Sequence, residues 1–270
     1  MTIALGIQCR EGVVLCTDSQ VTKEGGLKFN EGKIFNLYGD NERILLCYAG
    51  SPDIAKVIKE RIRIDVPPTL TSSEACEAIE IILRDTYKRH GTRQQVEMLC
   101  AIYRRDEGVK LFRIAGSVIR PADKAECLGV GDSSVLRFLA DTFLRDDITL
   151  AQGLTLGCYM VAKARTYIDG CGGPTQAVFL NHKGKMRNMN EVFIDGLDPM
   201  DGLSNAELGI RDLLYALSTR GDHKEALAAF DDDISGYGGP MIGTLDLMER
   251  YPDYFEGPET GRYEEPYSRL

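Results

Sequence analysis

The sequence predicts an α+β fold in which two antiparallel sheets are packed between layers of helices. Segments with strand and helix patterns come in blocks, in the order strands, helix pair, strands, helix pair, strands. A doubly wound parallel fold would instead alternate strand and helix regularly. Hydrophobic residues make up 43% of the 270 residues and charged residues 27%, an ordinary globular composition that can fill a substantial core.

The first fifty residues predict four strands, at 2–9, 13–17, 33–37 and 44–49. Each range is β-rich and either alternates or is continuously apolar, and glycine-containing turns separate the ranges. This arrangement is typical of an antiparallel meander, in which the ends of neighbouring strands lie side by side.

Two pairs of helices are predicted, and capping signals mark the start of three of these four helices. Ser51 followed by proline fits the start of one helix. Capping-box spacings at Thr71 and Thr149 begin two more, which end near residues 89 and 168. We expect the fourth helix at 132–144 and a later one at 204–217. The remaining strands are predicted at 96–104, 109–115, 127–130, 176–181 and 185–190, the last two as a hairpin.

Charge and periodicity divide the chain into a domain at 1–220 and an acidic C-terminal extension at 221–270. Residues 231–270 contain 10 Asp and Glu but only 3 Lys and Arg, and their apolar positions show no period. The net charge of −9 leaves no basic field for a phosphate backbone, which argues against nucleic-acid binding.

Several classes of protein are disfavoured. No apolar run approaches the roughly 18 residues of a membrane span, and the N-terminus lacks a signal-peptide pattern, so we expect a cytoplasmic protein that does not bind membranes. The eight cysteines form no C-x-x-C pair and are interpreted as reduced thiols. Only three histidines are present, widely separated, which disfavours a zinc site or a Ser-His triad. We expect no metal and no cofactor.

Thr2 is the residue that points most directly to chemistry. Loss of the initiator methionine would make it the first residue, and small second residues normally permit that loss. A threonine hydroxyl is a poor nucleophile until a base takes its proton, and a freed α-amine, with a pKa near ~8, can serve as that base. One residue can then supply both nucleophile and base.

Asp18 and Lys33 are the expected neighbours of Thr2. Asp18 ends the second predicted strand and Lys33 begins the third, so a meander would place both beside the start of the first strand. The lysine would lower the pKa of the amine and ease ionisation of the hydroxyl, while the aspartate would hold the lysine. The alternative is an ordinary surface ion pair. Lys28 is a weaker candidate, since no apolar strand follows it.

Several further motifs stand in a fixed order along the chain. They are Thr2-Ile3-Ala4, the run from Glu11 to Ser19, Gly32-Lys33-Ile34-Phe35, Tyr48-Ala49-Gly50, the run from Gly129 to Ser133, and Asp169-Gly170-Cys171-Gly172-Gly173. In this order the chain resembles the β-type subunits of the proteasome and their bacterial relatives, including HslV, over roughly residues 2–195. The resemblance implies the N-terminal nucleophile (Ntn) hydrolase fold, a four-layer αββα sandwich.

The resemblance also implies roles for particular residues. Thr2 would be the nucleophile, with Asp18 and Lys33 as the charged pair beside it. Asp169 and Cys171 are inexact counterparts of an aspartate and a serine in the family's motif. We do not expect Cys171 to act as a nucleophile itself, because no histidine lies near it in the motif and a thiol without a partner that lowers its pKa is usually inert.

The sequence departs from the family at two further positions. Cys47 stands where the family has the glycine whose backbone N–H stabilises the oxyanion, and a backbone donor survives the change. Val130 replaces a serine that contacts the threonine amine. An apolar specificity pocket is expected from Val21, Leu45 and Ala49.

Three functions remain open at this point. The first is hydrolysis of peptide bonds, in peptides or unfolded proteins, within a self-assembled homo-oligomer that is a ring or a spiral. The second is an Ntn amidase acting on a small-molecule amide. The third is a non-catalytic scaffold subunit like the α-type chains, although those carry an N-terminal extension that this sequence lacks. No phosphate-binding loop is present, so energy for unfolding would come from a separate ATPase.

Overall fold

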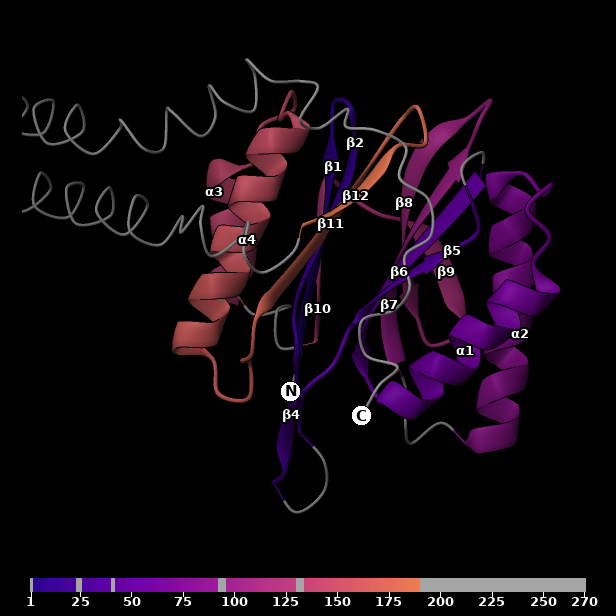
Figure 1. The fold of residues 1–270 in the computed structure, drawn as a ribbon, viewed down its shortest axis with the longest axis horizontal. Coiled ribbons are helices and arrows are strands. Elements are labelled where there is room, and N and C mark those ends of the chain that lie inside the picture. The colour runs from indigo at the N-terminus through magenta and orange to yellow at the C-terminus, as the bar shows by residue number, and fades with distance from the viewer. Residues whose placement is uncertain (1, 23–25, 40–41, 92–95, 130–133, 190–270) are drawn as a thin grey trace, which may run out of the picture.

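The protein is built from two facing sheets with helices on the outer side of each (Figure 1). The computed structural model describes residues 2–22, 26–39, 42–91, 96–129 and 134–189. The strands are β1 Ile3–Cys9, β2 Gly12–Asp18, β3 Gln20–Thr22, β4 Lys28–Asn30, β5 Ile34–Leu37, β6 Glu42–Gly50, β7 Val96–Arg104, β8 Gly108–Ala115, β9 Val118–Pro121, β10 Ala125–Gly129, β11 Thr175–Asn181 and β12 Met186–Met189. The helices are α1 Pro52–Asp65, α2 Ser72–His90, α3 Ser134–Phe143 and α4 Leu150–Tyr167. This is the predicted four-layer αββα sandwich.

The first sheet has the strand order β10-β1-β2-β11-β12, and its neighbouring strands pair antiparallel. Its outer face packs on α3 and α4, where buried side chains of β1, β2 and α4 form one apolar cluster. β1 lies between β10 and β2, so the residue that precedes it, Thr2, sits at the end of an interior strand.

Helix α4 lies close across β1 and β2 because two of its glycines face the sheet. A Cβ placed on Gly153 would lie 2.4 Å from Cys9 Sγ, and one on Gly157 would lie 2.7 Å from Cys16 Sγ. These distances are too short for real Cβ atoms, so any side chain there would push the helix outward. The same packing raises the pKa of Cys9 to about 12, mainly through burial.

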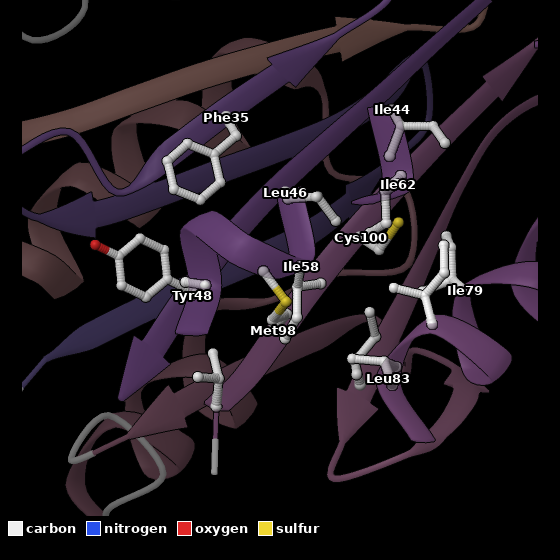
Figure 2. Close-up of a cluster of buried hydrophobic side chains, with 14 of the residues drawn as sticks. Phe35, Ile44, Leu46, Tyr48, Ile58, Ile62, Ile79, Leu83, Met98 and Cys100 are labelled. Atoms are coloured by element: carbon white, nitrogen blue, oxygen red, sulfur yellow. The ribbon is translucent and has the colours of Figure 1, made fainter. Parts of the chain in front are cut away.

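The second sheet has the strand order β5-β6-β7-β8-β9 and packs on α1 and α2. Figure 2 shows the cluster between them, with Phe35 and Tyr48 together at one end and Ile79 and Leu83 of α2 at the other. The rings of Phe35 and Tyr48 stack with centroids 5.4 Å apart. Alternate residues of β6 point the other way and fill a third cluster between the two sheets, as the two-residue period of a strand requires.

The predicted capping signals are confirmed. Ser51 Oγ accepts a hydrogen bond from the backbone of α1, and Thr71 and Thr149 each form a complete capping box at the start of α2 and α4. The eight cysteines all lie among the described residues and form no disulfide with one another.

The single meander predicted for the first fifty residues is wrong. β1 and β2 belong to the first sheet, whereas β5 and β6 belong to the second. Between them the chain forms a two-stranded hairpin, β3 with β4, which extends beyond the sandwich (Figure 1). Its strands have three residues each, too few to show a periodic pattern. The short strand β9 was missed for the same reason.

Three sequence predictions fall outside the described residues. They are the helix at 204–217, the domain boundary near residue 220 with its acidic extension, and the position of Val130. None of the described helices is long and apolar enough to cross a membrane.

The close approach of α4 gives a stability prediction. Gly157→Val is expected to destabilise the fold by about 1–3 kcal/mol, because the new side chain must displace Cys16 or the helix. Thermal unfolding followed by circular dichroism measures the effect. Gly39→Ala is the control, since a Cβ there meets nothing within 4 Å, and its melting temperature should hardly change. Wild-type stability of Gly157→Val would contradict the described packing.

Candidate active site

The ends of three strands bring a hydroxyl, a carboxylate and an ammonium group together. Thr2 precedes β1, Asp18 ends β2 and Lys33 precedes β5. Lys33 Nζ lies 3.0 Å from Thr2 Oγ1 and 2.7 Å from Asp18 Oδ1. The three residues singled out in the sequence therefore meet at one point, reached from both sheets.

The ammonium group of Lys33 uses all three of its protons. Besides Thr2 and Asp18, it donates to the backbone oxygen of Gln20 at 2.7 Å. The side chains of Lys33 and Asp18 are both 0% exposed. Burial lowers the pKa of Lys33 from its ordinary value, and the Asp18 carboxylate opposes that shift. Asp18 is thus the partner that offsets the loss of hydration around the Lys33 side chain.

Asp18 is held from several directions. Its Oδ1 accepts from the backbone N–H of Ile3 at 3.1 Å as well as from Lys33, and its Oδ2 accepts from the backbone N–H of Gly172 at 3.1 Å. These donors belong to β1, to the segment before β5 and to the loop before β11. A carboxylate that accepts hydrogen bonds at both oxygens has a fixed orientation.

Asp169 and Cys171 lie on the loop that follows α4, but they differ in surroundings. Asp169 is exposed, and no hydrogen bond or ion pair joins its side chain to another described residue. Cys171 is buried, and burial together with the Asp18 carboxylate raises the pKa of its thiol to about 11. Cys171 is therefore a neutral thiol near neutral pH, and its sulfur is a poor nucleophile.

Cys47 was expected to supply a backbone N–H for an oxyanion, and its place in the sheet does not fit that role. Cys47 lies within β6, opposite Ile34 of β5 and Leu99 of β7. In a strand paired on both sides, backbone N–H groups point at a neighbouring strand and are used by the ladder. Burial also raises the pKa of its thiol to about 12, and the side chain packs between the sheets.

The end of β6 is better placed than its middle to offer backbone N–H groups near Thr2. A Cβ on Gly129 would lie 2.3 Å from the backbone oxygen of Thr2 and 3.0 Å from Ala49 Cβ, so Ala49 and Thr2 share a neighbour. Gly50 follows with a φ of 114° and is exposed. β5 pairs with β6 only as far as Cys47, and from there to Gly50 the strand pairs with β7 alone, so its other side has no ladder partner among the described residues.

The pocket predicted from Val21, Leu45 and Ala49 is corrected at Leu45. Leu45 is 0% exposed and belongs to the cluster between the sheets. It lies four residues before Ala49, about 13 Å along an extended strand. Leu45 is thus a core residue. Val21 lies on β3 and Ala49 belongs to the inter-sheet cluster, and both side chains are buried.

Sequence reasoning missed several residues that shape this centre. Gln20 contributes its backbone oxygen, Gln176 contacts the backbone of Lys33, and Glu97 Oε2 accepts from the backbone N–H of Gly129 at 3.0 Å. The available signal was polarity: Gln176 and Glu97 stand in strands that are otherwise mostly apolar. Lys28, the weaker candidate for the role of Lys33, is exposed on β4.

Comparison of the sequence with models of known protein families identifies the family of this chain. The family model described as "Proteasome subunit" matches residues 2–173, most of the described chain. The chain belongs to the proteasome subunit family. Thr2, Asp18, Lys33 and Cys171 all fall inside the matched range.

Two curated members of the proteasome subunit family are similar in sequence. "Proteasome subunit alpha" of Methanocaldococcus jannaschii is 30% identical over 172 residues, which covers 60% of this chain and 64% of that protein. The protein of the same name from Archaeoglobus fulgidus is 28% identical over 160 residues, covering 57% and 63%. The chain therefore spans less than two thirds of the length of these relatives.

Solved structures show the same fold. The Gly-1 mutant of Anbu from Hyphomicrobium sp. strain MC1 has a TM-score of 0.67 at 14% identity, covering 81% of this chain and 97% of that one. Anbu from Yersinia bercovieri, described as an ancestral beta-subunit, has a TM-score of 0.66 at 14% identity, covering 77% and 95%.

No group of three or more His, Cys, Asp and Glu side chains that could hold a metal occurs among the described residues. Lys33 Nζ contacts Thr2 Oγ1 and is itself bound by Asp18, so it can stabilise negative charge on the Thr2 oxygen.

The buried ion pair gives a second stability prediction. Lys33→Met is expected to destabilise the fold by about 3–5 kcal/mol, because it leaves the Asp18 carboxylate buried without its countercharge. Asp18→Asn should also lower the free energy of unfolding, because it leaves the Lys33 ammonium group buried without its countercharge. The double variant should lose less stability than the two single variants lose in sum. Urea unfolding of all four proteins gives the coupling energy.

The exposed pair of Glu60 and Arg63 on α1 is the matched control. Their side chains are 48% and 56% exposed, and exposed pairs of this kind contribute little. Their coupling energy should lie near zero. Equally small coupling between Lys33 and Asp18 would show that their charges do not interact as the geometry requires.

Proposed function

We propose that the chain is a threonine-type hydrolase that cleaves peptide bonds through an acyl-enzyme on Thr2. The observation that carries the proposal is the 3.0 Å contact between Lys33 Nζ and Thr2 Oγ1, made by a lysine that is itself fully buried with Asp18. Burying two charges costs several kcal/mol per ion unless other contacts repay it. Buried ionisable groups beside a hydroxyl are typical of active sites.

The proton inventory of Lys33 supports a specific division of roles. A lysine whose three protons are all donated cannot also accept the proton of Thr2 Oγ1. It can stabilise negative charge that develops on that oxygen as the proton leaves. The base is then the α-amine of Thr2, which becomes free when Met1 is removed.

The proposed reaction has two steps. Thr2 Oγ1 bonds to the substrate carbonyl carbon while its proton passes to the α-amine, and the amine then protonates the leaving nitrogen as the C–N bond breaks. Water, deprotonated by the same amine, hydrolyses the resulting ester. While Met1 remains, its peptide nitrogen cannot act as a base, because the lone pair is delocalised into the carbonyl.

The oxyanion that forms in each step needs backbone donors at the end of β6. We assign this role to the Ala49–Gly50 region in place of Cys47, since Ala49 shares Gly129 as a neighbour with Thr2. Backbone N–H groups aimed at a developing oxyanion are worth roughly 10²–10³ in rate.

Substrate, assembly and partners follow from the family and are part of the proposal. We infer peptides or unfolded proteins as substrates, a homo-oligomer as the working form and a separate ATPase as a possible supplier of unfolded chains. A structure of Anbu from Pseudomonas aeruginosa is described as a helical assembly. We therefore retain both an open spiral and a closed ring as forms of the homo-oligomer. We also retain the division into a domain at 1–220 and an acidic extension at 221–270.

A non-catalytic scaffold subunit is the second candidate function. The curated relatives are named as alpha subunits, and alpha-type chains are the family's scaffold. The lysine, aspartate and threonine that meet at one point favour catalysis here. A small-molecule amide remains the alternative substrate for the same nucleophile.

Covalent labelling tests the nucleophile. A protein prepared with Thr2 as its first residue should react with a threonine-directed electrophile, and peptide mapping should place one adduct on Thr2. Thr2→Ala should abolish the adduct without unfolding the chain, because the change removes the hydrogen bond from Lys33 Nζ and only a few side-chain atoms. An adduct on Cys171, or none on the wild type, would contradict the proposal.

The rate of labelling tests Lys33. Lys33→Ala should slow labelling of Thr2 by about 100-fold or more, since it removes the charge that stabilises the ionised hydroxyl. The assay must be run where circular dichroism shows the variant folded, given the expected loss of stability. Lys28→Ala, an exposed lysine of the β3–β4 hairpin, is the control and should label normally. A near-normal rate for Lys33→Ala would remove Lys33 from the mechanism.

A further inference from the structure

The segment that carries Lys33 lies outside every sheet. β4 ends at Asn30 and β5 begins at Ile34, so residues 31–33 cross from the protruding hairpin to the second sheet without a ladder partner. Buried backbone groups must find hydrogen bonds elsewhere. The N–H of Glu31 donates to the backbone oxygen of Ser19 at 2.8 Å, but the other groups need a different source.

Gln176, at the start of β11, supplies that source. Its Oε1 accepts from the backbone N–H of Lys33 at 2.8 Å, and its Nε2 donates to the backbone oxygen of Glu31 at 3.2 Å. Its Oε1 also accepts from Thr17 Oγ1 at 3.3 Å, and Thr17 is its cross-strand partner on β2. A single amide group thus ties both sides of the crossing segment to the first sheet.

The position of Gln176 makes this role unusual. Val178 and Leu180, two and four residues further along β11, fill the apolar cluster between the sheets, and alternate residues of a strand share a face. A polar side chain on such a face is costly unless its hydrogen bonds are satisfied. Both polar atoms of the Gln176 side chain are satisfied here, and two of its partners belong to the segment of Lys33.

We propose that Gln176 is a positioning residue for Lys33, which it holds through the backbone of residues 31–33. The inference rests on the proposed function, because it concerns the lysine that acts on Thr2. Asp18 and the backbone oxygen of Gln20 fix the ammonium end of Lys33, and Gln176 fixes the backbone end. A lysine side chain has four rotatable bonds and would otherwise keep substantial freedom.

Holding both ends defines the distance between Lys33 Nζ and Thr2 Oγ1. Charge stabilisation in the transition state depends on donors that are already in place, and small misplacements can cost up to about 100-fold in rate. Gln176 does not touch the reacting atoms. Its loss should therefore reduce the rate at Thr2 without removing any reacting group.

The test compares Gln176→Leu with Gln8→Leu in a protein that begins at Thr2. Gln8 lies on the same sheet, and its Nε2 donates to the backbone oxygen of Ala122 at 2.9 Å, so both variants lose side-chain hydrogen bonds to the backbone. Gln176→Leu should slow electrophile labelling of Thr2 by about 10-fold or more. Gln8→Leu should stay within about twofold of the wild type.

Hydrogen exchange gives a readout that does not depend on activity. The amide of Lys33 should exchange faster in Gln176→Leu, whereas its rate in Gln8→Leu should match the wild type. Gln176→Glu keeps both acceptor contacts and should lose less labelling rate than Gln176→Leu. If Gln176→Leu does not fold, Gln176→Glu carries both measurements, with a smaller loss of rate and protection expected.

The outcomes separate the inference from the proposed function. An unreactive wild type contradicts the proposed function, while faster exchange at Lys33 in Gln176→Leu would still support the positioning contact. Normal labelling together with unchanged exchange in Gln176→Leu would overturn the inference. Equal slowing in Gln176→Leu and Gln8→Leu would also overturn it, because the effect would then be general loss of stability.

Discussion

The buried ion pair between Lys33 and Asp18 is the interaction on which the centre of this protein depends. The two side chains are fully shielded from water, and the pair joins β2 of the first sheet to the segment that enters the second. Two unpaired charges could not remain in such a place, since desolvation would force one of them to become neutral. Each charge is thus retained because the other is there. The Lys33 ammonium group donates one hydrogen bond to Asp18 and one to a backbone oxygen, and it donates the third to the hydroxyl of Thr2.

The rest of the fold holds this pair at the edge where the two sheets meet. Gln176 ties the Lys33 segment to β11, and on the other flank Glu97 of β7 binds the backbone of Gly129, which abuts Thr2. Arg113 of β8 in turn donates to Glu97 and to the buried carboxylate of Glu126. Polar side chains also cross between the sheets at the far end of the strands, where Arg43 of β6 donates to the backbone oxygen of Gly184 and His182 Nδ1 accepts from the backbone N–H of Val109. Apolar side chains fill the cluster between these two ends.

Local patterns predicted most of the elements, and the site residues came from their ends. Thr2, Asp18 and Lys33 were found because each stands at a boundary of a strand that its own sequence marks. The sheet partition was not predictable, because the three-residue strands of the hairpin carry no period. Gln176 was missed because its partners lie 143 and 159 positions away. The choice of Cys47 as oxyanion donor has a similar cause, since only the sheet pairing shows that Cys47 has strand neighbours on both sides and that β5 ends opposite it.

Membership of the proteasome subunit family leaves the choice between catalyst and scaffold to this chain's own residues. The central claim is that Thr2 is a working N-terminal nucleophile, which requires its nitrogen to be a free amine. The most direct measurement is intact-mass and peptide mass spectrometry of the protein isolated from its native cells, with and without exposure to a threonine-directed electrophile. The account predicts a chain that has lost one methionine and carries a single adduct on Thr2. A chain that retains Met1 throughout and carries no adduct would contradict it and leave the scaffold function in its place.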